Sequence, residues 1–454
     1  MTGGEVFEAS YLQESLYRAA DDGESAVNVA VVLRLSGVLD RDRLFGALSG
    51  LAARHEALRT ALASHGGQVQ QVVAPSLAVP ATVLDVTAEL DPDAEAVRLI
   101  RDHLRRPFDL HGPSLWRAML ISCGHDRHLL ALSLHHAIMD GWSARVLTDE
   151  LRLLYGDGDS ERLAPPSLQF ADYAAWERKT ADSVPLAPWT ERLSTDNMRA
   201  RPPGASDPGP EQLAQALELP EGEPGLLDDI QKLSRERRVP VVAVLAAAVA
   251  VSLRECGEPG DAATGRARVE PSLTMGLVRA NREHAELRDV VGYLADILPL
   301  TVDLRGDPDF GSLVSRVAES LAFSQDHAAP LAALSRVIRS GRPEGPLFDV
   351  CINFLPAGPA SDQAAGPLRI ARVDIPERDI VRSRWWDGTA VIDYHLRSDE
   401  SRRLSGRVRA DINAIPPDRL EDLGERFWSA LARGSACPDL PLSALVPISA
   451  GGRQ

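Results

Sequence analysis

The chain of 454 residues is long enough for more than one domain, and its 44% hydrophobic and 25% charged residues are typical of a globular protein. Its formal net charge of −16 argues against nucleic acid and anionic membrane surfaces as partners. The longest apolar run, 241–253, is too short to span a bilayer, and the N-terminus has no basic segment followed by an apolar one, so neither a membrane helix nor a secretory signal is predicted.

Runs typical of strands alternate with runs typical of helices along the first 200 residues. Strands are expected at 27–35, 68–73 and 128–134, and helices at 41–62, 93–104 and 143–155. A stretch rich in proline and glycine, 201–210, predicts a linker. The same mixture then returns, with helices expected at 226–237, 241–255, 310–327 and 417–433 and strands at 271–278, 348–354, 389–396 and 406–412. We therefore expect two mixed α/β lobes, residues 1–185 and 186–454.

The four cysteines indicate a reducing compartment. They stand at positions 123, 256, 351 and 437, too far apart and too irregularly spaced for a disulfide framework. Together with the missing secretory signal, they predict a cytoplasmic protein.

The segment 132–143, LSLHHAIMDGWS, carries the most distinctive chemistry of the chain. It places two adjacent imidazoles, a carboxylate and a glycine between His135 and Gly141. An apolar run precedes it and apolar residues at helical spacing follow it, so the motif is predicted to lie on a turn from a buried strand into a helix. Because successive residues of a strand point to opposite faces, we expect one of the two imidazoles to be packed and the other to face a cleft.

Other interpretations of this motif were weighed against a catalytic one. Metal ligands would have to converge, at helical spacing or with cysteine partners, and the chain contains no HExxH or CxxC pattern. A serine-hydrolase triad would need a GxSxG turn, which is missing. A structural histidine pair, with Asp140 capping the helix that follows, stays open from the residues alone.

Residues His135–Gly141 resemble the HHxxxDG signature of nonribosomal peptide synthetase condensation domains and their acyltransferase relatives. Further stretches resemble motifs of the same family, in the family's order, between residue 10 and about residue 350. They are Ser10–Tyr17 (SxxQxxLW), Arg54–Thr60 (RHExLRT), Arg106–Pro113 (PFDLxxGP), Asp172–Trp176 (DYAxW), Gly292–Leu300 (GxFxNxLPL) and Pro346–Val350 (PLFQV). One departure is Asp296, which stands where the family usually has asparagine.

The resemblance implies two chloramphenicol-acetyltransferase-like α/β sandwich lobes in a V-shaped pseudodimer, with the histidine motif in a tunnel between them. It also implies transfer of an acyl or aminoacyl group from the phosphopantetheine arm of a carrier protein to an amine or hydroxyl acceptor, which is a small molecule or is held by a second carrier. No bound cofactor, metal, nucleic acid or membrane is expected. The chain ends soon after its last predicted helix, so a free-standing enzyme is expected.

The resemblance also assigns roles to individual residues. His136 would be the general base, since a hydroxyl needs its proton removed to attack at neutral pH. His135 would pack on the other side, and Gly141 would allow close backbone approach or lend its N–H to an oxyanion. Asp140 would be structural, in an ion pair with Arg282, for which Arg279 is the rival. Two alternatives remain: a CoA-dependent acyltransferase of the same superfamily and a non-catalytic recruiting domain.

Overall fold

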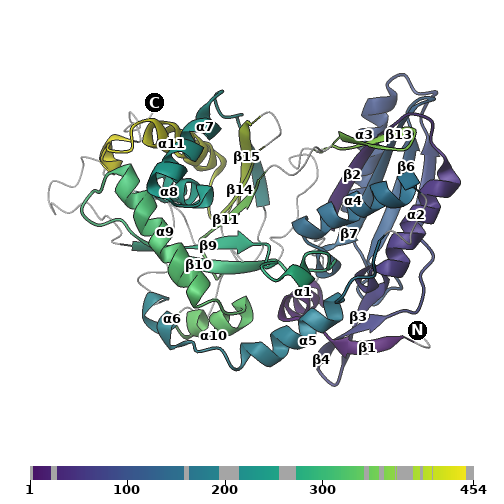
Figure 1. Ribbon diagram of the computed structural model, residues 1–454, viewed down its shortest axis with the longest axis horizontal. Helices are drawn as coiled ribbons and strands as arrows, with labels where there is room; N and C mark the ends of the chain where they lie inside the picture. The colour runs from purple at the N-terminus through teal and green to yellow at the C-terminus, as the bar shows by residue number, and fades with distance from the viewer. Residues whose placement is uncertain are drawn as a thin grey trace. The chain divides into compact units, whose positions relative to one another are not determined.

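The computed structural model resolves the chain into two compact units, which are described separately. The described residues are 4–21, 28–157, 163–193, 214–254, 272–341, 347–356, 362–373, 375, 392–398, 402–411 and 413–445. The first unit comprises Met1–Ser183, Ala280–Ala295 and Pro359–Asp387; the second comprises Val184–Arg279, Asp296–Gly358 and Gly388–Gln454. Both units are mixed α/β structures built on a six-stranded sheet (Figure 1).

The main sheet of the first unit is mostly antiparallel. Its strands lie in the order β12 (Asp362–Ala365), β13 (Leu368–Arg372), β2 (Asn28–Ser36), β7 (Arg127–His135), β6 (Trp116–Ser122) and β5 (Ala81–Asp85). Only the β5–β6 pair is parallel among these strands. A second, three-stranded sheet has the order β1 (Glu5–Glu8), β4 (Gln68–Val73) and β3 (Thr60–His65).

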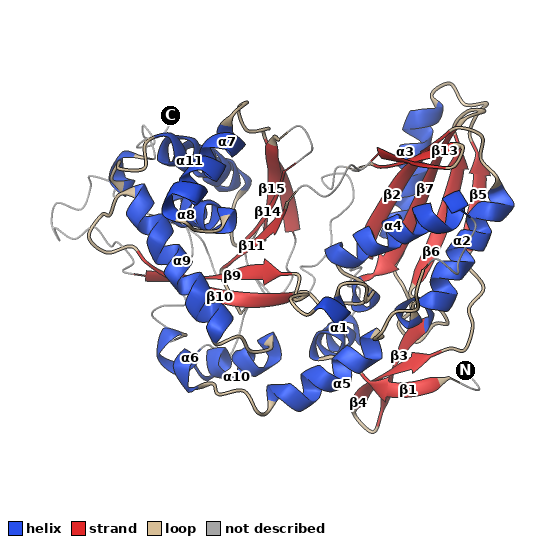
Figure 2. Cartoon of the chain, viewed as in Figure 1, coloured by secondary structure: helices blue, strands red, loops and turns tan. Residues whose placement is uncertain are grey.

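Helices cover both faces of the main sheet in the first unit (Figure 2). The helices are α1 (Tyr11–Asp21), α2 (Arg41–Arg54), α3 (Pro92–Arg105), α4 (Gly141–Asp157) and α5 (Phe170–Ala181). Alternation along β2 explains the two layers: Val31 and Leu33 belong to the core shared with α2 and α4, whereas Val32 belongs to the core shared with α3. The strand and helix predicted on either side of the histidine motif are thereby confirmed as β7 and α4.

The predicted helix 41–62 is wrong beyond Arg54. His55 has extended backbone angles (φ −105°, ψ 111°), Glu56–Arg59 forms a 3-10 turn, and β3 begins at Thr60. The side chain of His55 explains the break, because its Nε2 lies 2.6 Å from a carboxylate oxygen of Glu150 on α4. Pairing of β3 with β4 then outweighs the helical spacing of leucines in this stretch.

The second unit has helices packed against one face of its sheet. The strands lie in the order β10 (Asp296–Asp303), β9 (Ser272–Arg279), β11 (Val350–Leu355), β14 (Ile392–Ser398), β15 (Leu404–Asp411) and β8 (Ala214–Leu219). The helices are α6 (Ala187–Arg192), α7 (Leu226–Arg237), α8 (Val241–Leu253), α9 (Phe310–Asp326), α10 (Leu331–Gly341) and α11 (Pro417–Ala436). Every residue of α8 from Ala243 to Leu253 is buried, as expected for a helix that is apolar on all sides.

The predicted C-terminal lobe, residues 186–454, is not continuous in the structure. The segment 280–295 leaves β9, joins the first unit and returns to β10, and β13 pairs with β2 of the first unit. Contacts between residues far apart in the sequence therefore determine which segments belong to each unit. The predicted linker 201–210, Cys256 and the start of the strand predicted at 389–396 lie outside the described residues.

Two further properties bear on the expectations from composition. In the described part of the chain, none of the helices combines the length and the apolar character needed to cross a lipid bilayer. The three cysteines that the structure describes, Cys123, Cys351 and Cys437, are free thiols.

Candidate functional site

The histidine motif occupies the turn between β7 and α4 in the first unit. β7 ends at His135, residues His136–Ile138 form a 3-10 turn, and α4 begins at Gly141. The side-chain amide of Gln13 donates to the carbonyl of Ala137 (2.9 Å), and Gln13 itself is fully buried. The glutamine of the SxxQ motif therefore supports this turn, a role that sequence spacing alone did not reveal.

His135 is a buried, neutral imidazole. The residue is 3% exposed, and its Nδ1 accepts the backbone N–H of Ala137 (3.2 Å). Burial, with a smaller contribution from the neighbouring His136, lowers the pKa of His135 to about 3. A neutral ring with one nitrogen already accepting a hydrogen bond is suited to packing rather than to proton transfer.

His136 is partly exposed, in contrast to the residue before it. Its ring lies against the ring of Tyr293, with 4.2 Å between the centroids and 46° between the planes. The different environments predicted for the two histidines are present, but strand alternation is not the cause. His136 lies beyond the strand, and the 3-10 turn redirects its side chain.

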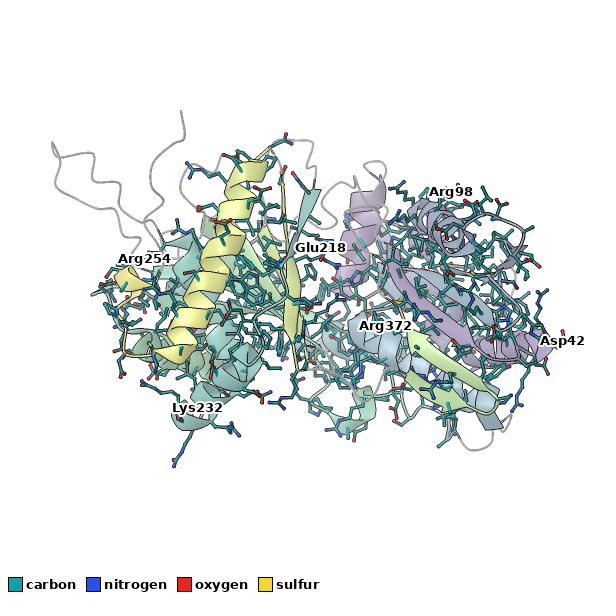
Figure 3. All side chains as sticks on the ribbon, turned by 90° about the horizontal axis from the view of Figure 1, so that it is seen from above. Asp42, Arg98, Glu218, Lys232, Arg254 and Arg372 are labelled. Atoms are coloured by element: carbon teal, nitrogen blue, oxygen red, sulfur yellow. The ribbon has the colours of Figure 1, made fainter. Side chains whose placement is uncertain are left out.

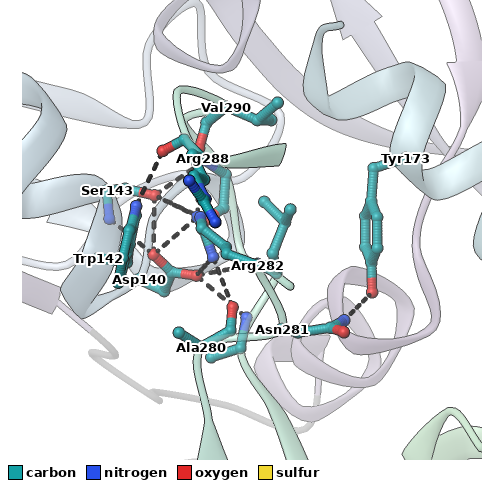
Figure 4. A network of polar contacts seen from close by, with 12 residues as sticks. Asp140, Trp142, Ser143, Tyr173, Ala280, Asn281, Arg282, Arg288 and Val290 are labelled. Atoms are coloured by element: carbon teal, nitrogen blue, oxygen red, sulfur yellow. Dashed lines mark hydrogen bonds and ion pairs between the residues drawn. The ribbon is translucent and has the colours of Figure 1, made fainter. Parts of the chain in front are cut away.

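Asp140 and Arg282 form a fully buried ion pair (Figure 4). Arg282 Nη1 donates to Asp140 Oδ2 (2.9 Å) and Nη2 donates to Oδ1 (3.2 Å), and each side chain is 1% exposed. The same guanidinium donates to the backbone carbonyls of Ala280 (2.7 Å) and Val290 (3.1 Å). Of the two arginines offered by the resemblance, Arg282 is the one that pairs with Asp140.

Asp140 also organises the backbone of two segments, the start of α4 and residues 294–295. Its Oδ1 accepts the N–H of Ser143 (2.8 Å), which caps the N-terminus of α4. Its Oδ2 accepts the N–H groups of Leu294 (3.1 Å) and Ala295 (3.0 Å). The cap expected from the structural interpretation and the ion pair expected from the resemblance therefore coexist in one carboxylate.

Ser143 extends this network to the segment 280–295. Its hydroxyl accepts from Gly292 N–H (3.1 Å) and donates either to Asp140 Oδ1 (2.8 Å) or to Gly292 O (2.9 Å). Sequence reasoning did not single out Ser143, although its place three residues after a capping aspartate was a usable signal. The segment is held at its other end by Asn281, whose amide donates to the hydroxyl of Tyr173 (2.9 Å).

The rival arginine, Arg279, has a different partner in the second unit. Its Nη2 lies 3.3 Å from Oδ2 of Asp296, the residue that departs from the family pattern. Asp296 Oδ1 accepts the backbone N–H groups of Ile297 (2.8 Å) and Leu331 (3.2 Å). Burial raises the pKa of Asp296 above its usual value, although Arg279 and these N–H groups act in the opposite direction.

Gly141 and Trp142 are the first two residues of α4. Gly141 is exposed, which fits a backbone position open to a ligand. Trp142 is partly buried, and its indole N–H donates to the carbonyl of Arg288 (2.8 Å). Trp142 therefore contributes to packing of the segment 280–295.

The described residues contain no group of three histidine, cysteine, aspartate or glutamate side chains that could hold a metal ion. Charges of both signs project from the helices, for example Asp42 on α2, Arg98 on α3 and Lys232 on α7 (Figure 3). The chemistry available at the turn is thus that of one partly exposed imidazole beside a buried neutral one, on a backbone fixed by an ion pair.

Comparison with known proteins agrees with the family resemblance found in the sequence. The family described as "Condensation domain" matches residues 5–366. A curated relative, phosphinothricin tripeptide synthetase PhsC of Streptomyces viridochromogenes, is 28% identical over 448 residues, which cover 94% of this chain and 38% of PhsC. The chain thus spans well under half of that synthetase.

Two solved structures share the fold. The X-domain in its complex with OxyB from teicoplanin biosynthesis gives a TM-score of 0.78 at 21% identity, covering 98% of this chain and 96% of the other. The SgcC5 protein from Streptomyces globisporus, solved with a naphthyl ethanediol and sucrose, gives 0.72 at 24% identity, covering 96% and 100%.

Proposed function

Because the chain belongs to the condensation-domain family, whose members are acyltransferases of natural-product biosynthesis, we propose a specific form of that activity for it. The enzyme takes an acyl or aminoacyl group from the phosphopantetheine thioester of a carrier protein. It transfers the group to an amine or hydroxyl, forming an amide or an ester. The observation that carries the proposal is the pair of adjacent histidines in different states, His135 buried and neutral and His136 partly exposed.

His136 acts as the general base in this proposal. The acceptor nitrogen or oxygen attacks the thioester carbonyl, His136 takes the proton of the acceptor, and the thiolate of the pantetheine arm leaves and is protonated. A hydroxyl acceptor needs this help most, since it is a poor nucleophile at neutral pH. No acyl-enzyme forms, because the donor thioester is already activated.

The other motif residues act in support. His135 holds the turn through its bond to Ala137 N–H, and Asp140 with Arg282 fixes the backbone around it. Gly141, exposed at the start of α4, offers a backbone N–H for the oxyanion of the tetrahedral intermediate. Neither metal nor nucleotide takes part, so activity should persist in EDTA and without ATP.

The donor is a separate carrier protein, and the acceptor is a small molecule or a second carrier. The enzyme acts free-standing in this proposal and meets its carrier-bound donor in trans. The diol bound to SgcC5 is an alcohol, which supports a hydroxyl acceptor here. Free thiols at the described cysteines are consistent with the cytoplasm as the site of action.

The decisive experiment compares His136→Ala with His125→Ala, which removes an exposed histidine from the turn between β6 and β7. Acyl-carrier protein is offered with a panel of amines and alcohols, in EDTA and without nucleotide. His136→Ala should lower kcat by about 10²–10⁴-fold, whereas His125→Ala should not. Near-normal turnover of folded His136→Ala with an alcohol would disprove the general-base role.

The same assay separates the alternative donors. Acyl-carrier protein, the matching acyl-CoA and a short thioester are compared by kcat/KM, since remote binding of the carrier should assist positioning of the thioester. Equal values for all three donors would contradict carrier recognition, and a preference for acyl-CoA would favour the CoA-dependent alternative.

A recruiting domain is the second candidate, favoured by the likeness to an X-domain solved in complex with OxyB. The presence of both histidines weighs against it. Absence of turnover with every donor and acceptor, together with tight binding of a partner enzyme, would support this candidate.

A further inference from the structure

Among the residues that the structure describes, Tyr293 packs its ring against the imidazole of His136. Tyr293 is 5% exposed, so it is itself held firmly, whereas His136 is partly exposed. We propose that Tyr293 is a positioning residue, which holds the imidazole of His136 in the orientation needed for proton transfer. This role rests on the proposed function of His136 as general base.

The peptide before Tyr293 is fixed between two helices. Gly292 N–H donates to the hydroxyl of Ser143 on α4 (3.1 Å). A Cβ on Gly292 would lie 2.1 Å from Cδ2 of Phe170 on α5, so no larger residue fits there without movement. The backbone entering Tyr293 therefore has little freedom.

The peptides after Tyr293 are fixed by Asp140. The N–H groups of Leu294 and Ala295 both donate to Asp140 Oδ2, and Arg282, paired with Asp140, also donates to Val290 O (3.1 Å). The ion pair thus acts on His136 indirectly, because it fixes the backbone next to Tyr293 and the ring of Tyr293 contacts the imidazole. In this proposal, Asp140 acts on catalysis along this path without touching the substrate.

A ring contact is well suited to this task. Aromatic pairs prefer particular offset or tilted geometries, so the contact restricts rotation of the imidazole. The ring face does not take up the proton that a general base must accept, so it restrains His136 without competing with the acceptor. A base has to lie within hydrogen-bonding distance of that proton, and small errors of angle are costly.

Two substitutions of Tyr293 test the proposal in the full chain. Tyr293→Leu should lower kcat by about 10–100-fold while changing KM by less than about threefold, because orientation is lost and binding is kept. Tyr293→Phe keeps the ring and should retain kcat within about threefold of the wild type. An equal loss in both variants would overturn the proposal, since the hydroxyl rather than the ring would then matter.

A spectroscopic measurement on the unliganded protein separates this proposal from the function. The 13Cε1–H signal of His136, assigned with His136→Ala, should be single in the wild type and in Tyr293→Phe. It should broaden or split in Tyr293→Leu, because the ring then samples several orientations. This result stands even if His136→Ala retains activity, in which case the proposed function fails and the positioning contact does not.

The matched control is Tyr155→Leu. Tyr155 lies near the end of α4, is 1% exposed and accepts the N–H of Asp40 (3.1 Å). Its loss should lower thermal stability but leave kcat and the His136 signal of the folded protein unchanged. If Tyr293→Leu does not fold, Tyr293→Met, which fills the space with a flexible side chain, carries the same expectations. An unchanged kcat and a single His136 signal in the non-aromatic variant would overturn the proposal.

Discussion

Replacing Asp140 with alanine is expected to destabilise the first unit by about 3–5 kcal/mol, since the guanidinium of Arg282 would stay buried without its carboxylate. Both side chains are 1% exposed, so solvent cannot replace the lost partner without opening the structure. A loss of this size is a large part of the ~5–15 kcal/mol by which domains are usually stable.

The hydrogen bonds of Asp140 do not change this estimate of the loss in stability. Asp140 accepts hydrogen bonds from Arg282, Ser143 N–H, Leu294 N–H and Ala295 N–H. Each bond to a charged group contributes roughly 1.5–3 kcal/mol when measured alone. The bonds share one carboxylate and one relaxing segment, so their contributions do not add, and the estimate for the stranded charge is the better guide. Asp140→Asn keeps the shape and one acceptor oxygen and should lose less.

The assay is urea unfolding, with hydrogen exchange of peptides from 280–295 used to assign the transition to the first unit. The double variant Asp140→Ala with Arg282→Met is the critical comparison, because it removes the stranded charge. It should be more stable than Asp140→Ala alone. Asp102→Ala, which breaks an exposed pair with Arg98, is the control and should change stability little. A double variant no more stable than the single one would refute the stranded-charge explanation.

Three other variants probe the surroundings of the motif. Burial lowers the pKa of His135 to about 3, so the unfolded chain binds more protons than the folded one below about pH 6.5, and stability is lost as the pH falls from there. His135→Ala should flatten this loss of stability in acid-unfolding curves, and an unchanged slope would contradict the explanation. Gly292→Ala should lower the stability measured by thermal unfolding by about 1–3 kcal/mol or more, because the new methyl group would meet Phe170. Adding Phe170→Leu should recover part of this stability, whereas no effect of Gly292→Ala would show that α5 can shift freely. Burial raises the pKa of Asp296, so the charge of this residue costs stability as the pH rises through that pKa. Asp296→Asn should therefore stabilise the protein at neutral pH, with a gain that fades toward the ordinary aspartate pKa in a pH series of melting curves. A loss of stability at neutral pH would mean that the pair with Arg279 dominates.

Features set by local sequence were the ones that could be predicted. The apolar run before His135 and the helical spacing after Trp142 gave β7 and α4, because both elements bury a face that the local pattern records. The same spacing misled at residues 55–62, where cross-strand pairing and the contact of His55 with Glu150 determined the structure.

The site was predictable only in part, for the same reason. The sequence pointed to Asp140 but left Arg279 and Arg282 as rival partners, because both lie in one short stretch. Strand pairing separates them: Arg279 lies opposite Asp296 at the end of β9, and Arg282 lies beyond the strand, in the segment that joins the first unit. Nothing local marks Tyr293 as the neighbour of His136, since 157 positions separate them in the numbering.

The pairing of β13 with β2 has a consequence for how the protein is made. Arg372 pairs with Leu33, so one edge of β2 has no β13 partner until the ribosome has added more than 300 further residues. At usual elongation rates of about 5–20 residues per second, that wait lasts roughly 20–70 seconds. During it the nascent chain presents a strand edge rich in valine and leucine, the kind of surface that other chains and chaperones bind. The six-stranded sheet of the first unit is therefore completed only when residues 362–372 have been made, long after its other strands.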